Sequence, residues 1–286
     1  HSDDFAEQLL QRLQQYPQLR PQQLRLEILE TGALQDMQHV SQLVDQLQAQ
    51  GIEFALDDFG TGFSSLTFLK QLRAKTLKID QSFVRQALED PEQAMIIDSI
   101  VGLARSFERE VIAEGVESEA HGLLMLQLGC ELGQGYAIAR PMPAQAVAAW
   151  LASWQPPASW QASQALDEQG VQLLLAELAH VAWLRQLQEY LSNQQSDAPQ
   201  AHADSCRFGR WLDKPETRQR YAGREDFQAL LKQHAALQEL AVQLLRRHRE
   251  DAHQNISQGL ANLLATSASL MRKLHRLRQS LHASDD

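Results

Sequence analysis

The sequence predicts two structural halves, a parallel α/β half followed by an all-α half. Upstream of "SWQPPASWQASQ" (153–164), short apolar runs alternate with amphipathic stretches, which is typical of a parallel sheet with crossover helices. Downstream of this stretch the strand patterns stop, and long segments with helical apolar periodicity follow. The length of 286 residues and the 44% hydrophobic content allow one large domain or two medium ones.

Five short apolar runs in the first half read as strands. They are "LRLEIL" (24–29), "EFALDD" (53–58), "TLKID" (76–80), "VIAEGV" (111–116) and "GYAIA" (135–139). Helices are expected between them, including 36–50 and 93–107, and Gly51 is suited to the end of the first of these helices. The alternation indicates either an open doubly wound sheet or a barrel.

The second half is predicted to be a helical bundle. Three segments carry apolar stripes at helical spacing: 166–191, 225–247 and 256–281. Trp154 and Trp160 flank two consecutive prolines, which stiffen a linker. We therefore expect a first domain over 1–153, a linker over 154–165 and a helical domain over 166–283.

Charge is distributed unevenly along the chain. Residues 1–155 contain 11 Lys/Arg and 21 Asp/Glu, whereas residues 156–286 contain 15 of each. An acidic first half excludes a broad nucleic-acid surface and suits a site that collects cations.

The two cysteines are distant in sequence and predict no disulfide framework, as expected in the cytoplasm. No membrane span or signal peptide is predicted, and an initial His1 indicates a piece of a longer polypeptide.

Acidic residues recur where the predicted strands end. Glu27 lies in the first strand, and the ends of the next three are marked by Asp57 with Asp58, by Asp80 and by Glu114. The carboxyl ends of parallel strands meet at one edge, so these acids should form a ring that holds Mg²⁺ or Mn²⁺. Two such ions suit phosphodiester cleavage. Lys78 should point the same way as Asp80, where it could orient or deprotonate the attacking water.

Five motifs of this half resemble those of EAL-domain cyclic-di-GMP phosphodiesterases. They are "LEILETG", "ALDDFGTGFSSL", "LKIDQSFV", "AEGVES" and "LGCELGQGYAIARPMP", within roughly residues 5–152. The resemblance implies a TIM-like barrel that hydrolyses cyclic di-GMP to pGpG with two Mg²⁺ or Mn²⁺ ions. It also implies roles for residues of the site. The metal ligands would be Glu27, Asp57, Asp58 and Glu114, with Asp80 in or beside the metal shell. Lys78 would hold the catalytic water, Glu30 would steady the loop after the double aspartate, and Gln134 would lie near the substrate.

The resemblance also implies missing parts. The family's Glu-Ala-Leu strand and a metal-binding Asn would lie upstream of "LRLEIL", so the chain should form a partial TIM-like barrel with the last five of eight strands. We expect this fragment alone to be inactive and the parent protein to be the phosphodiesterase. The alternatives are a non-catalytic cyclic-di-GMP receptor and a structural dimerisation module. We further expect a cytoplasmic homodimer, with any membrane anchor upstream and no nucleic-acid partner.

The helical half contains a possible zinc site. Cys206 in "SCRFGRWL" lies 26 residues after His180 and 28 before His234, and His with Cys is a typical zinc set. "AHVAW", "CRFGRWL" and "LLKQHAALQELA" resemble the chemoreceptor zinc-binding domain, a four-helix bundle with a His₃Cys site. His180, Cys206 and His234 match three ligands, but Gln238 stands where the fourth histidine is expected. Either water or His202 completes a weakened site, or Cys206 has become a redox-sensitive thiol.

Overall fold

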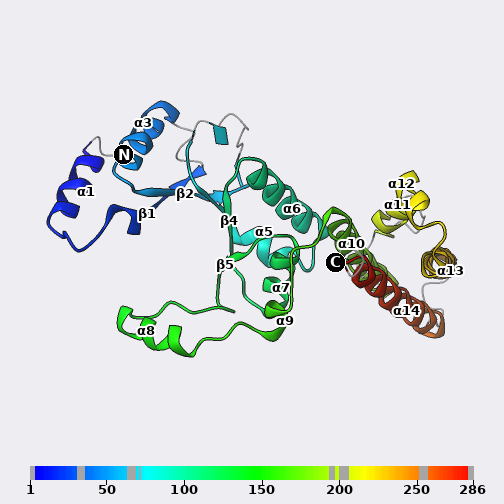
Figure 1. The fold of residues 1–286 in the computed structure, drawn as a ribbon. Helices are drawn as coiled ribbons and strands as arrows, with labels where there is room; N and C mark the ends of the chain where they lie inside the picture. Colours follow the sequence, from blue (N-terminus) through cyan, green and yellow to red (C-terminus); the bar gives the residue numbers. More distant parts are fainter. Residues whose placement is uncertain are drawn as a thin grey trace. The chain divides into compact units, whose positions relative to one another are not determined.

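The computed structural model describes residues 4–30, 36–62, 69–70, 72–192, 197–199, 206–250 and 257–282. The chain divides into two compact units. One comprises residues 1–88 and 92–165, and the other comprises residues 89–91 and 166–286 (Figure 1). The first is an α/β unit and the second is helical, which confirms the predicted fold classes. Among the described residues, no helix is both long and apolar enough to cross a membrane.

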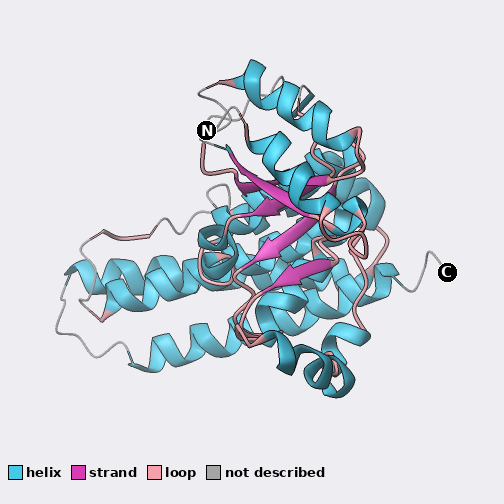
Figure 2. Cartoon of the chain, turned by 90° about the vertical axis from the view of Figure 1, so that its left-hand side faces the viewer, coloured by secondary structure: helices cyan, strands magenta, loops and turns pink. Residues whose placement is uncertain are grey.

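Five parallel strands form the sheet of the first unit (Figure 2). They are β1 (Arg25–Leu29), β2 (Glu53–Phe59), β3 (Thr76–Ile79), β4 (Glu110–Glu114) and β5 (Leu132–Gln134). Each strand pairs with the next one in the chain, so the spatial order equals the chain order. A doubly wound sheet reverses its strand order at a switch point, and this order instead matches a continuous stretch of a barrel.

The predicted position of the fifth strand was wrong. The strand covers Leu132–Gln134, and the chain turns at Tyr136–Ile138 instead of extending there. Gly135 lies so close to the backbone of Val116 that a Cβ would overlap it, and the amide of Ala137 then donates to the Val116 carbonyl at 2.9 Å. The correction matters because Gln134 ends the strand rather than preceding it, in register with Glu114.

Helices follow the strands of this unit as predicted. They are α1 (Phe5–Gln14), the 3-10 helix η1 (Pro21–Gln23), α3 (Met37–Gln48), α5 (Gln81–Gln86), α6 (Pro91–Ser106), α7 (Glu119–Gln127), α8 (Ala144–Ser153) and α9 (Ala158–Gln161). Asp36 caps α3 by accepting the amide of His39, and Gly51 reverses the chain after α3 with a φ of +92°. Helix and strand side chains form the core together; they include Leu47, Phe54, Leu56, Leu77 and Ile97.

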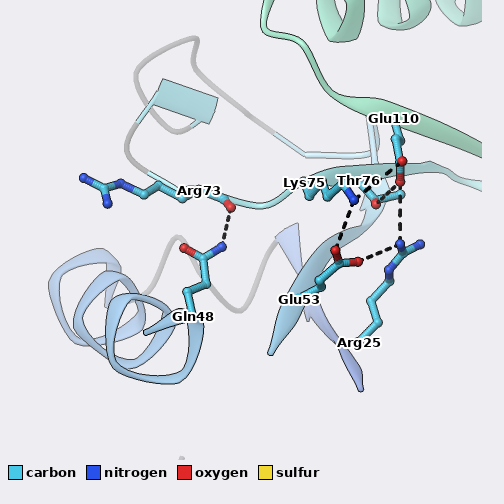
Figure 3. Close-up of polar contacts among 7 residues, drawn as sticks. All are labelled: Arg25, Gln48, Glu53, Arg73, Lys75, Thr76 and Glu110. Carbon is cyan, nitrogen blue, oxygen red and sulfur yellow. Dashed lines mark hydrogen bonds and ion pairs between the residues drawn. The ribbon is translucent and has the colours of Figure 1, made fainter. Parts of the chain in front are cut away.

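An ion-pair network joins the amino ends of four strands (Figure 3). Glu53 pairs with Arg25 at 2.9 Å and with Lys75 at 3.0 Å, and Glu110 accepts a hydrogen bond from Thr76 at 3.3 Å. The charged groups are a third to a half exposed, so each pair contributes at most about 1 kcal/mol. This edge of the sheet is therefore structural, and it lies opposite the edge where the acids are expected.

The second unit is built from three long and two short helices among its described residues. They are α10 (Glu168–Leu191), α11 (Arg207–Asp213), α12 (Pro215–Tyr221), α13 (Glu225–Glu250) and α14 (Ser257–His282). The core combines leucines of the long helices with an aromatic group of Phe208, Trp211, Tyr221 and Phe227. Pro215 at the first position of α12 and Asp167 as the cap of α10 fix where these helices begin.

Candidate functional site

Lys78 lies at the centre of the acidic site at the carboxyl ends of the strands. Its ammonium contacts Glu27 at 2.7 Å, Asp57 at 2.8 Å and Glu114 at 2.6 Å. The three acids come from β1, β2 and β4, so side chains of three other strands surround Lys78 on β3. The Lys78 side chain is only 6% exposed. Burial by itself lowers its pKa, but the hydrogen bonds to Asp57, Glu114 and Glu27 outweigh burial and raise the pKa overall.

Asp57 and Asp58 both face this site although they are adjacent in a strand. Neighbouring strand residues normally point to opposite faces of the sheet. The pairing of β2 with β3 shifts register between Leu56 and Phe59, and Asp58 has a positive φ of 55°. This irregularity turns the second carboxylate, and ligand atoms of Asp57, Asp58 and Glu114 lie within 4.8 Å of one another. Strained backbone of this kind is frequent at functional sites.

The trio formed by Asp57, Asp58 and Glu114 is electrostatically suited to a divalent cation. Burial raises the pKa of Asp58, and repulsion from Asp57 and Asp80 raises it further. Burial likewise raises the pKa of Glu114, against the opposing effect of its pair with Lys78. A hard cation with oxygen preference would relieve this repulsion. These residues therefore fit the Mg²⁺ or Mn²⁺ that the resemblance implies.

Asp80 and Glu30 lie beside the trio and have structural contacts of their own. Asp80 caps α5 by accepting the amide of Ser82 at 2.9 Å, and it does not join the trio. Glu30 is fully buried and accepts the amide of Gly60 at 3.0 Å, and its carboxylate leaves no space for a side chain at Gly62. Glu30 thus holds the turn after the double aspartate, up to the point where residues 63–68 fall outside the described chain.

Gln134 completes the carboxyl edge on β5. It is paired in register with Glu114, and its carbonyl accepts the amide of Val116 at 3.0 Å. Its side chain is exposed, as expected for a residue that would meet a ligand from outside.

The helical unit brings Cys206, His234 and Gln238 together. The sulfur of Cys206 lies 3.2 Å from Nε2 of His234, and Nε2 of Gln238 lies 3.2 Å from the same histidine atom. Cys206 caps α11, where its sulfur accepts the amide of Gly209 at 3.0 Å. His180 lines the same small cavity of about 10 Å³, which is about the size of one water or ion. His202 lies outside the described residues.

The donor set of this cavity fits zinc. Two imidazoles and one thiol match the nitrogen and sulfur ligands that structural zinc takes. Burial lowers the pKa of His180 to about 4 and also lowers that of His234, so both rings are neutral at pH 7 and can offer a lone pair. Burial raises the pKa of Cys206, which therefore does not resemble an activated, exposed thiolate. This observation counts against the redox reading.

The structure adds one residue to this site that the sequence reading missed. Ser267 on α14 lies 2.9 Å from Nε2 of His180, and both residues are buried. A signal existed in the sequence, because Ser267 interrupts an apolar helical stripe formed with Leu263, Leu270 and Leu274. A polar residue in a buried stripe usually has a specific partner.

Comparison with known proteins assigns families to both units. The family model "EAL domain" matches residues 1–141, and "Chemoreceptor zinc-binding domain" matches residues 180–245. The bifunctional diguanylate cyclase/cyclic di-GMP phosphodiesterase MucR of Pseudomonas aeruginosa is 42% identical over 134 residues, which are 47% of this chain and 20% of MucR. The probable cyclic di-GMP phosphodiesterase PdeD of Escherichia coli is 39% identical over 136 residues, which are 48% of this chain and 25% of PdeD.

A solved structure agrees with the match to the EAL domain. The crystal structure of the EAL domain of Mycobacterium smegmatis DcpA is similar with 34% identity and a TM-score of 0.50, over 55% of this chain and 70% of that one. The chain spans about a fifth to a quarter of the length of the two curated relatives named above. The chain therefore belongs to the EAL-domain family, matched over residues 1–141, and its helical unit includes the match to the model "Chemoreceptor zinc-binding domain" over residues 180–245.

Proposed function

We propose that the protein containing this chain hydrolyses cyclic di-GMP to linear pGpG with two divalent cations. The observation that carries the proposal is the group of three carboxylates within 4.8 Å of one another, two of which also contact a buried lysine. The names of the relatives MucR and PdeD support the same substrate. Mg²⁺ or Mn²⁺, when bound, would neutralise phosphate charge and make water a better nucleophile.

Each residue of the site has a defined task in this proposal. Asp57, Asp58 and Glu114 would hold a cation, with Glu27 beside them. Water adds to one phosphorus atom and loses a proton to solvent, one P–O ester bond within the cyclic nucleotide breaks, and the freed ribose oxygen takes up a proton to become a hydroxyl. Lys78 stays protonated in its three ion pairs, so its task is to orient the water rather than to accept its proton.

The neighbouring residues act on the surroundings of the reaction. Glu30 holds Gly60 and thereby steadies the loop after the double aspartate, and Gln134 presents an exposed amide beside Glu114 to the substrate. Asp80 lies close enough to raise the pKa of Asp58, which supports a role for it beside the proposed metal shell.

For the helical unit we propose zinc binding by His180, Cys206 and His234 with regulation of the EAL domain. The contact between Cys206 and His234 and the ion-sized cavity support the site. We propose the domain limits 1–153 and 166–283 with a linker over 154–165, in line with the boundary between the two compact units after residue 165. A homodimer is part of the same proposal.

The test is cyclic-di-GMP hydrolysis by the full-length protein in Mn²⁺, with and without stoichiometric zinc. Asp57→Asn should abolish turnover, whereas the matched control Asp45→Asn, on an exposed side chain of α3, should retain it. A rate that changes with zinc supports regulation by the helical unit. Binding without turnover in the unmodified protein would instead support the receptor alternative, and absence of nucleotide binding would leave only a structural dimerisation module.

A further inference from the structure

His180 makes its hydrogen bond to a residue outside the proposed zinc site, whereas the other residues of the site contact one another. Its Nε2 atom lies 2.9 Å from the hydroxyl of Ser267, a residue of α14 that is only 2% exposed. His180 itself is 5% exposed, so water cannot readily replace this hydrogen bond. The contact spans 87 residues of sequence and joins α10 to α14.

The remaining donors already contact one another without His180. Cys206, His234 and Gln238 lie within 3.2 to 3.6 Å of each other. Among the described residues, the only trio of possible ligand atoms that all lie within 4.8 Å is the acidic one in the other unit. His180 therefore lines the cavity but is not close enough to share an ion with Cys206 and His234 in this arrangement.

We propose that Ser267 is a positioning residue that holds His180 away from the zinc site in the metal-free protein. Zinc binding then exchanges the hydrogen bond between His180 and Ser267 for a bond from His180 to the metal. This inference rests on the proposed zinc site. The serine hydroxyl left behind can donate to a carbonyl one turn earlier in its own helix, so the exchange leaves no buried group unpaired.

The exchange has a predictable effect on affinity. The hydrogen bond stabilises only the metal-free state, so zinc must bind against it. Removing the hydroxyl should therefore tighten zinc binding, by about 5- to 10-fold for one buried neutral hydrogen bond. A serine that merely oriented His180 toward the metal would have the opposite effect, because its loss would weaken binding.

The experiment is a zinc titration of the full-length protein against a chromogenic chelator. Ser267→Ala should bind zinc about 5- to 10-fold more tightly than the unmodified protein. Ser267→Thr and Ser267→Val form a matched pair of equal shape in which only Thr keeps the hydroxyl, so Val should bind more tightly than Thr even if both disturb packing. Ser269→Ala on the same helix is the control and should bind like the unmodified protein.

A second set of variants, made in a protein that lacks the His180 side chain, tests whether Ser267 acts through His180. In a protein that carries His180→Ala, the further change Ser267→Ala should have no effect on zinc affinity, since the partner of the hydroxyl is gone. Equal or weaker binding by Ser267→Ala, or equal binding by the Thr and Val pair, overturns the inference while leaving the zinc site in place. Absence of zinc competition in both the unmodified protein and Ser267→Ala overturns the zinc site and the inference with it.

Discussion

Replacing Lys78 with methionine should destabilise the EAL unit strongly. The ammonium is 6% exposed and contacts two carboxylates that are themselves less than a fifth exposed, Asp57 and Glu114. Removal of one member of a buried ion pair costs about 3–5 kcal/mol, because charges remain without compensation. The third partner, Glu27, is half exposed and adds at most about 1 kcal/mol. Methionine fills a similar volume, so little of the loss should come from packing.

The measurement is calorimetric unfolding of the full-length protein without divalent cations. A loss of about 3–5 kcal/mol corresponds to a fall of roughly 6–20 °C in the melting temperature of a domain of this size. The matched control is Lys75→Met, since Lys75 also pairs with two acids but is 52% exposed, and it should shift the transition by no more than a few degrees.

Two conditions distinguish this electrostatic explanation from a packing effect. The penalty in Lys78→Met should shrink as the pH falls from 7 to 5, because burial raises the pKa of Glu114 and its uncompensated carboxylate takes up a proton. Mn²⁺ should restore much of the lost stability, because the cation supplies the missing positive charge. A penalty that is independent of both pH and Mn²⁺, or one as small as that of Lys75→Met, would refute the reasoning.

Two further predictions concern other parts of the chain. A side chain at Gly122 would overlap the ring of Trp160, whose indole donates a hydrogen bond to the Glu119 carbonyl at 2.8 Å. Gly122→Ala should therefore release the linker and shift tryptophan emission to the red. The control Gly102→Ala, where the added methyl group meets open space, should leave the emission unchanged. In the helical unit, burial raises the pKa of Glu177 to about 7. The folded unit should thus lose about 3 kcal/mol as the pH rises from 4.5 to above 7, a loss that unfolding at several pH values should show and that Glu177→Gln should remove.

The first four strands and the acidic edge were predictable for a local reason. Each of the first four apolar runs has a carboxylate within it or at its end. Parallel strands bring their carboxyl ends to one edge, so no knowledge of register was needed. The convergence of Asp57 and Asp58 was not predictable in this way. It depends on a register shift and a positive φ, which are properties of the paired strands rather than of either sequence segment.

Contacts between distant helices mark the limit of sequence reasoning in the second unit. Cys206 and His234 were recognised as partners because a motif carries them, whereas the pairing of His180 with Ser267 depends on how α10 and α14 lie against each other. The predicted position of the fifth strand was wrong for a related reason. "GYAIA" has the alternation of a strand, but Gly135 lets the chain pack against the Val116 backbone, and the extended segment is displaced to Leu132–Gln134.

The backbone conformation of Asp58 and the raised pKa of its carboxyl both support the proposed metal site. Its backbone has a conformation that costs a non-glycine residue free energy, and burial together with the charges of Asp57 and Asp80 raises the pKa of its carboxyl. Lys78 relieves this repulsion only in part, because its ion pairs go to Glu27, Asp57 and Glu114 rather than to Asp58. A chain selected for stability alone would avoid both costs with a glycine or asparagine at this position. A bound cation would offset both costs, so the strain at Asp58 supports the proposed metal site at this edge of the sheet.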